Sequence, residues 1–234
     1  MRSKKKKIGN SIKTWPKYER PRELLLEKGP DQVSDAGLIA ILLRSGTKGK
    51  DAVSFARDLI KQFGGLRGLL NAKKSDLEKI KGLGAAKIAQ LMAAIEITKR
   101  QLKEDIIGKN YIENDRDVID YLSLSMRDLK EEFFKVIYLT KANSILLIED
   151  LVKGTVDQAS IYPREVIKKA LDINASAVIF VHNHPSGSMK PSQFDIDITK
   201  KLISACQVVD ITPLDHIIIS PYGHISLKSK NLFK

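Results

Sequence analysis

Apolar side chains recur at helical spacing through the first half of the chain. The stretch at 34–46, SDAGLIAILLRSG, begins with a serine suited to cap a helix and stops at Gly46. The stretch at 51–65, DAVSFARDLIKQFGG, repeats this pattern, with an aspartate at its start and two glycines at its end. Residues 73–103 predict a short helix, a Gly-Leu-Gly hairpin and a long helix. The pattern therefore predicts an α-helical N-terminal domain over residues 21–105.

From about residue 132 the pattern is that of an α/β C-terminal domain. Two runs rich in aromatic and β-branched residues, FFKVIYLT and SILLIEDLV, flank a Lys-Ala-Asn turn and predict a β-hairpin. A helix with Pro163 in its first turn leads to the apolar strand ASAVIFVH, and Ser192 is the expected N-cap of another helix. DHIIIS and GHISL are closing strands. We expect a mixed β-sheet flanked by helices over 132–234. A linker at 106–131 connects it to the helical domain, and a basic arm at 1–20 precedes the helical domain.

The composition of the 234-residue chain is ordinary for a soluble globular protein, and the features below lead us to expect a cytoplasmic one. The apolar runs GLIAILL and AVIFV are far shorter than a membrane span, and the basic N-terminal segment lacks the apolar stretch of a signal peptide. Cys206 is the only cysteine, which excludes an internal disulfide and fits a reducing compartment. We interpret it as a small apolar helix residue.

The excess positive charge belongs to the first half of the chain. Residues 1–110 hold 25 Lys and Arg against 12 Asp and Glu, a net of +13, whereas residues 111–234 hold 15 against 16. Such asymmetry favours a polyanionic partner for the first half, and no amphipathic membrane helix is evident. We expect non-specific DNA binding through residues 1–110; the alternative is a basic surface that only aids solubility.

Two of the four histidines stand one residue apart at the end of an apolar strand, in VIFVHNHPSGSMKPSQFDID. On an extended strand, His182 and His184 point to the same side. Asp195 follows after a loop with two prolines and a glycine, and it lies in the first turn of the next helix. Two imidazoles and one carboxylate form the ligand set of catalytic zinc, with a fourth position open to water. The sequence therefore predicts a Zn²⁺ site at this end of the strand.

Other residues near this stretch are weaker candidates for ligands. Asp197 lies about half a turn from Asp195 on the helix and should face elsewhere. His216 and His224 lack a partner at a suitable spacing, so we interpret both as structural strand residues. By themselves, two histidines near a strand end are more often structural, and the proline, serine and aspartate at their intervals favour a metal site.

The segment HNHPSGSMKPSQFD resembles the signature of the JAMM (JAB/MPN) metalloproteases, His-x-His-Pro-x6-Ser-x-x-Asp. Together with DLVKGTVDQASIYPRE, YPREVIKKALDINASAVIFVHNHPSG and LDHIII, it resembles the bacterial RadC family over residues 20–227. The resemblance implies a cytidine-deaminase-like JAB/MPN fold, Zn²⁺ held by the two histidines and Asp195, and a Ser192 that helps to stabilise an oxyanion. Asn183 departs from the serine or threonine of JAMM proteases; it should face away from the metal and leaves the substrate class open.

JAMM enzymes also use a glutamate as general base, at the start of the first strand of the domain. Glu132, directly before FFKVIYL, matches that position best, because its neighbour Glu131 would point to the opposite side of a strand. Glu165, on the helix that begins with YPRE, is the second candidate. We favour Glu132 and expect the carboxylate of Glu165 to lie away from the ligands.

The segment LEKIKGLGAAKIAQLMAAI resembles a helix-hairpin-helix DNA-binding motif. Gly82 and Gly84 allow a tight turn whose backbone N–H groups can meet a phosphate, next to the positive N-terminus of a helix. Lys81 and Lys87 flank the turn and could neutralise nearby phosphates. Such units also serve as protein contacts or as plain packing.

The sequence leaves two main functional hypotheses. The first is a RadC-like, zinc-dependent JAMM-type peptidase or isopeptidase that acts on a peptide or protein substrate and carries a DNA-binding helical domain. The second is a DNA-binding accessory protein of repair or recombination with a structural or vestigial metal site. A hydrolase acting on nucleic acid is a third option, and a full ligand set with a candidate base favours catalysis.

Overall fold

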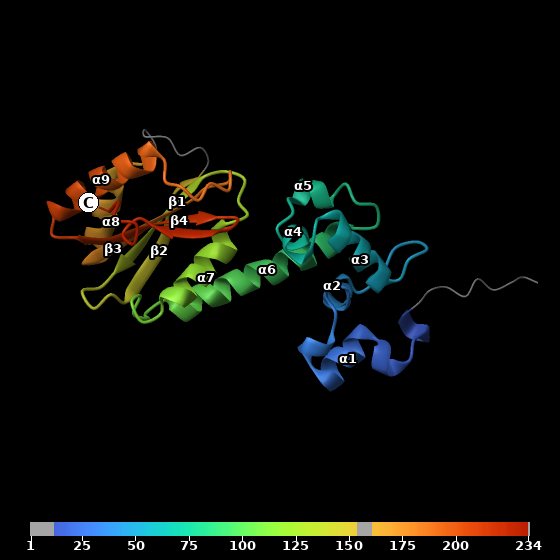
Figure 1. The fold of residues 1–234 in the computed structure, drawn as a ribbon. Helices are drawn as coiled ribbons and strands as arrows, with labels where there is room; N and C mark the ends of the chain where they lie inside the picture. Colours follow the sequence, from blue (N-terminus) through green and yellow to red (C-terminus); the bar gives the residue numbers. More distant parts are fainter. Residues whose placement is uncertain (1–11, 154–160, 234) are drawn as a thin grey trace, which may run out of the picture. The chain divides into compact units, whose positions relative to one another are not determined.

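The computed structural model describes residues 12–153 and 161–233 (Figure 1). The chain divides into two compact units, Met1–Ile97 and Thr98–Lys234. The first is helical and the second is a mixed sheet with flanking helices, which confirms the predicted fold class. Within the described residues, no helix is long and apolar enough to cross a membrane.

The first unit is built from short helices around one apolar core. These are α1 (Pro21–Lys28), α2 (Asp35–Leu43), α3 (Ala52–Gln62), α4 (Leu66–Leu70), α5 (Lys74–Leu77) and the beginning of α6 (Ala85–Ile106). The predicted caps are confirmed: Ser34 Oγ accepts the N–H of Gly37, and the Asp51 carboxylate accepts two N–H groups of α3. Helix α2 ends three residues before the predicted stop at Gly46. Gly46 instead permits a close backbone approach, since a Cβ there would lie 2.1 Å from the carbonyl oxygen of Lys50.

The segments predicted to be an arm and a linker contain more regular structure than expected. Residues 12–20 form two 3-10 turns, Ile12–Thr14 and Lys17–Glu19, whereas residues 1–11 of the predicted arm lie outside the described residues. The segment 106–131 contains helix α7 (Asp115–Met126), which buries Val118, Leu122 and Met126 against the sheet of the second unit. The boundary between the units also lies inside α6, because that helix continues past Ile97.

The second unit holds a five-stranded sheet in the order β2-β1-β3-β4-β5. Strands β1 (Phe133–Leu139) and β2 (Ile145–Lys153) form the predicted hairpin, and β1 also pairs antiparallel with β3 (Ala177–Asn183). Strand β4 (Thr212–Ser220) runs parallel to β3 and antiparallel to β5 (Gly223–Ser226). Helix α8 (Pro163–Asp172) precedes β3, and helix α9 (Gln193–Gln207) connects β3 to β4. The sheet is therefore mixed, as predicted.

Helices cover both faces of this sheet (Figure 1). Helices α8 and α9 pack against the face that carries Val178 and Phe180 of β3. Helix α7 and the end of α6 pack against the opposite face, which carries Ile179 and Val181. Because side chains alternate along a strand, His182 belongs to the α8/α9 face. The start of α9 lies near the end of β3, where the two candidate histidine ligands are found.

Candidate metal centre

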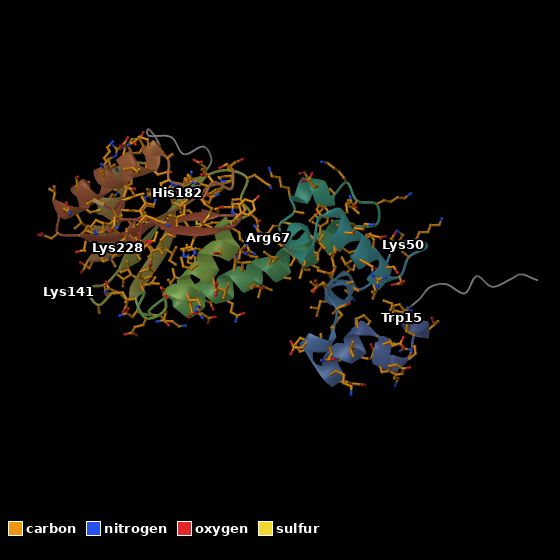
Figure 2. The ribbon with its side chains drawn as sticks, viewed as in Figure 1. Trp15, Lys50, Arg67, Lys141, His182 and Lys228 are labelled. Atoms are coloured by element: carbon orange, nitrogen blue, oxygen red, sulfur yellow. The ribbon has the colours of Figure 1, made fainter. Side chains whose placement is uncertain are left out.

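The structure brings His182, His184 and Asp195 together in one buried group. His182 is near the end of β3 (Figure 2), His184 directly follows the strand, and Asp195 lies in the first turn of α9. Their exposed fractions are 3, 7 and 4%. The Nε2 atoms of the two histidines are 3.1 Å apart, and the carboxylate oxygens of Asp195 lie 3.0 Å from the first and 3.2 Å from the second.

These separations fit a shared metal ion. A tetrahedral ion that holds nitrogen and oxygen ligands at ~2.1 Å separates its ligand atoms by about 3.4 Å. The two Nε2 atoms, and each Nε2 with its nearer Asp195 oxygen, lie slightly closer together than that, and each of the three residues is of a type that binds divalent cations. A set of three protein ligands leaves a fourth position for water or substrate, as in catalytic rather than closed structural sites. The arrangement could therefore hold a catalytic metal ion.

Asp195 serves the helix and the candidate site at once. Its backbone N–H donates to Ser192 Oγ, and its Oδ2 accepts the N–H of Ser192 at 2.6 Å, which together form a capping box. Burial acts to raise the pKa of Asp195, but the hydrogen bonds with His182 and His184, the charge of His182 and the N–H of Ser192 outweigh it and hold this pKa well below its ordinary value. The carboxylate is thus ionised and fixed in direction, as a metal ligand must be.

The tautomer of His184 follows from its second ring nitrogen. Nδ1 of His184 lies 3.2 Å from the carbonyl oxygen of Ser188, which can only accept, so Nδ1 carries the proton and Nε2 faces the site. Burial lowers the pKa of His184, whereas its hydrogen bond with Asp195 raises it, and the net shift is upward. A bound metal would compete with this proton for Nε2.

A buried relay fixes the tautomer of His182 in the same way. The Thr199 hydroxyl donates to the backbone oxygen of Asp195 and contacts Nδ1 of His216. Since its only proton is committed, Thr199 accepts from His216 Nδ1–H, which leaves Nε2 of His216 as an acceptor. That Nε2 lies 2.8 Å from Nδ1 of His182, so His182 donates from Nδ1 and directs the lone pair of Nε2 toward the site.

His216 was expected to be only a structural strand residue, and the relay gives it a further role. It is fully buried, and burial together with the neighbouring His182 lowers its pKa well below the ordinary value, so it stays neutral. The strand alternation of β4 could not reveal this, because the contact depends on the parallel pairing of β3 with β4. His224 is exposed on β5, and Asp197 is exposed and accepts a hydrogen bond from Gln193.

Ser192 stands at the edge of the site as the N-cap of α9. Its Oγ accepts the N–H of Asp195, which leaves the hydroxyl proton available for another acceptor. The residue is exposed, whereas Asp195 in the same turn is buried. Ser192 could therefore donate a hydrogen bond to a molecule bound at the candidate metal site, which is the role that the sequence resemblance implies for it.

Glu132 and Glu165 lie in different surroundings. Strand β1 pairs Phe134 with His182, and continuing this antiparallel register by two residues brings Glu132 opposite His184. The negative charge of Glu132 accordingly contributes to the raised pKa of His184. Glu165 pairs with Arg164 and lines a cavity of about 320 Å³ with residues of β2 and α8. The geometry therefore favours Glu132 as the carboxylate near the candidate ligands.

In the first unit, the hairpin residues singled out from the sequence differ in their availability. Lys81 and Gly84 are exposed, and Gly82 has a φ of +93°, a conformation that suits glycine. The ammonium of Lys87 instead donates to the carbonyl oxygens of Gly46 and Gly82 and lies 5.2 Å from the ring centroid of Phe55. Lys87 thus holds the hairpin against a neighbouring loop, a packing role that sequence spacing could not separate from a phosphate contact.

Comparisons with known proteins agree with this architecture. Residues 112–232 match the RadC-like JAB domain family, and residues 12–89 match the UPF0758 N-terminal family. The chain is 44% identical to a UPF0758 protein of Marinomonas sp. (strain MWYL1), in an alignment that covers 95% of this chain and 99% of that protein. It is 46% identical to a UPF0758 protein of Cellvibrio japonicus, over 94% and 98% of the two chains. This chain therefore belongs to the UPF0758 family, and its C-terminal unit is a RadC-like JAB domain.

Proposed function

We propose that this chain is a zinc-dependent hydrolase of JAMM type that cleaves an amide or isopeptide bond in a peptide or protein. The observation that carries the proposal is the spacing of His182, His184 and Asp195: the two Nε2 atoms lie 3.1 Å apart, and each lies 3.0 or 3.2 Å from one oxygen of the buried Asp195 carboxylate. The tautomers support it, because both histidines donate from Nδ1 and present Nε2 to the same point. A structural site closed by four protein ligands would need one more donor than this group contains.

Each residue would have a distinct task in the reaction. His182, His184 and Asp195 would hold Zn²⁺, which lowers the pKa of water and polarises a carbonyl group when it is bound. Glu132 would accept a proton from the attacking water and deliver it to the leaving amine. The free hydroxyl proton of Ser192 would donate to the carbonyl oxygen as negative charge develops on it.

The test is a screen of the zinc-loaded full chain against peptide and isopeptide substrates. Glu132→Gln should keep zinc and lose at least 100-fold in kcat, because the amide cannot accept the proton. Glu165→Gln is the matched control and should behave as the unchanged chain does. Equal loss in both variants, or full activity in Glu132→Gln, would contradict the assignment of the base.

A second candidate function is non-specific DNA binding by the first unit. It rests on the net charge of +13 over residues 1–110, which include the whole of this unit, and on a hairpin whose Lys81, Gly82 and Gly84 are exposed. Helix α6 begins at Ala85, directly after this hairpin, so the positive end of its dipole lies there. If metal binding proved to be purely structural, this activity would make the chain a DNA-binding accessory protein.

Duplex binding over a range of salt concentrations tests this second function. Lys81→Ala should weaken binding equally for different sequences and reduce the slope of log K against log salt by about 1. Lys141→Ala, an exposed lysine of the second unit, is the control and should leave the slope unchanged. Binding that does not depend on salt would reject the electrostatic basis of the proposal.

A further inference from the structure

Asn183 lies between the two candidate histidine ligands but faces the other way. It is the last residue of β3 and only 1% of it is exposed. Its Oδ1 accepts the backbone N–H of Phe133 at 2.8 Å, and its Nδ2 donates to the backbone oxygen of Glu131 at 3.1 Å. The side chain is therefore hydrogen-bonded to the backbone on both sides of Glu132.

The primary amide is the chemical group that this position requires. One atom must accept an N–H and another must donate to a carbonyl about two residues away, and the two ends of an amide do this at once. A carboxylate could only accept, and the single oxygen of a shorter serine or threonine would have to make both bonds. Asn183 thus extends the pairing of β1 with β3 beyond Phe134 and His182 by means of its side chain.

These two hydrogen bonds are important because they hold the backbone on either side of Glu132, which lies near the candidate ligands. The β1–β3 register places Glu132 opposite His184, on the face of the sheet that carries the candidate ligands. Glu132 precedes the first residue of β1, so the strand itself does not hold its backbone. A displacement of a catalytic carboxylate by ~1 Å can lower the reaction rate about 100-fold.

We propose that Asn183 is a positioning residue that fixes the Glu131–Phe133 segment and thereby aims the Glu132 carboxylate at the candidate metal site. The inference rests on the proposed role of Glu132 as general base. It also explains why this chain carries asparagine between its two histidines: the residue serves the base rather than the metal.

Asn110 provides a matched control in the same unit. Its Oδ1 accepts the N–H of Ile112 and its Nδ2 donates to the carbonyl oxygen of Ala142, both at 2.9 Å. Asn110→Ala therefore removes the same two kinds of hydrogen bond as Asn183→Ala. It does so at a loop that contains none of the candidate site residues.

The first experiment uses the metal-free full chain, so it depends on neither zinc nor a substrate. In Asn183→Ala, amide exchange of Phe133 should rise at least tenfold and the ¹⁵N order parameter of Glu132 should fall, with Val136 unchanged. Asn110→Ala should leave all three amides as they are. Unchanged exchange at Phe133 and an unchanged order parameter at Glu132 in Asn183→Ala would overturn the proposed positioning.

The second experiment compares kcat in Asn183→Ala, Glu132→Gln and the double variant, each loaded with zinc. We expect Asn183→Ala to lower kcat 10- to 100-fold with KM and zinc affinity unchanged, and to add less than threefold in the Glu132→Gln background. Independent, multiplying losses would mean that Asn183 does not act through Glu132 and would overturn the inference. If the unchanged chain cleaves no substrate, the proposed function fails, and the metal-free measurements alone decide whether Asn183 fixes Glu132.

Discussion

Nε2 of His216 lies 2.8 Å from Nδ1 of His182, and both side chains are buried. One histidine thereby sets the tautomer of another, and Thr199 sets the tautomer of the first. The relay leaves the Nε2 lone pair of His182 directed at His184 and Asp195. It ties a candidate ligand on β3 to β4 and α9, so the geometry of the site depends on the packing of all three elements.

Replacing His216 should weaken metal binding although His216 is not itself a candidate ligand. In His216→Phe, the Nδ1–H of His182 loses its acceptor and the preferred tautomer is no longer fixed. We expect zinc affinity to fall 10- to 100-fold, the usual effect of losing such a supporting group, as measured by competition with a chelator. His224→Ala, at an exposed position on β5, is the control, and an equal loss in both variants would contradict the relay.

Removing the Thr199 hydroxyl should destabilise the metal-free protein. In Thr199→Val, the buried N–H of His216 has no acceptor, which costs about 1–3 kcal/mol in the free energy of unfolding. Thr199→Ser keeps the hydroxyl and should retain most of the stability. Denaturant unfolding of the two variants measures the difference, and a Val variant as stable as the Ser variant would argue against the hydrogen bond.

The metal-free protein should lose stability between about pH 6.5 and pH 5. Burial and the neighbouring His182 lower the pKa of His216, so in this window the unfolded chain binds a proton that the folded chain does not. Stability therefore falls as the pH falls. Two other shifted groups change the free energy of unfolding only outside this window. The raised pKa of His184 makes stability depend on pH above about pH 6.5, and the lowered pKa of Asp195 does so below about pH 3.9. Unfolding curves at pH 7 and 5.5 should differ less in His216→Gln; an equal difference would assign the loss to other groups.

Local patterns predicted most of what forms the candidate site. The i, i+2 spacing of His182 and His184 on a strand, and the Ser192 cap that begins α9, depend on residues close together in sequence. The hydrogen bond between His216 and His182 depends on the parallel pairing of β3 with β4. The hydrogen bonds of Asn183 to the backbone beside Glu132 depend on the β1–β3 register. Such contacts join residues 34 to 52 positions apart, and periodicity carries no information about them.

The helical unit and the linker each depart from the prediction for another reason. The caps at Ser34 and Asp51 follow from local chemistry and were predicted, whereas α2 ends at Leu43 because Arg44 adopts the left-handed conformation, which its residue type did not indicate. Helix α7 lies in a segment that was predicted to be a linker, although half of its residues are apolar. Val118, Leu122 and Met126 recur at helical spacing and pack against the sheet, so this helix could have been predicted from its periodicity.

Lys81 and Lys87 should separate DNA binding from stability. Lys87→Ala removes two hydrogen bonds to carbonyl oxygens and the contact with Phe55, and it should lower the free energy of unfolding by about 1 kcal/mol. Lys81→Ala changes an exposed side chain and should leave stability within about 0.5 kcal/mol. Thermal or denaturant unfolding of both variants provides the check. Greater destabilisation by Lys81→Ala would contradict the packing role assigned to Lys87.

The most direct test of the metal centre is the zinc stoichiometry of the full chain, measured after zinc loading and gel filtration. We predict one ion per chain, one ion per chain in the control His224→Ala, and less than a tenth of an ion in His184→Ala. Circular dichroism should confirm that His184→Ala is folded. A chain that binds no zinc, or a folded His184→Ala variant that keeps a full ion, would contradict the assignment of His182, His184 and Asp195 as the metal site.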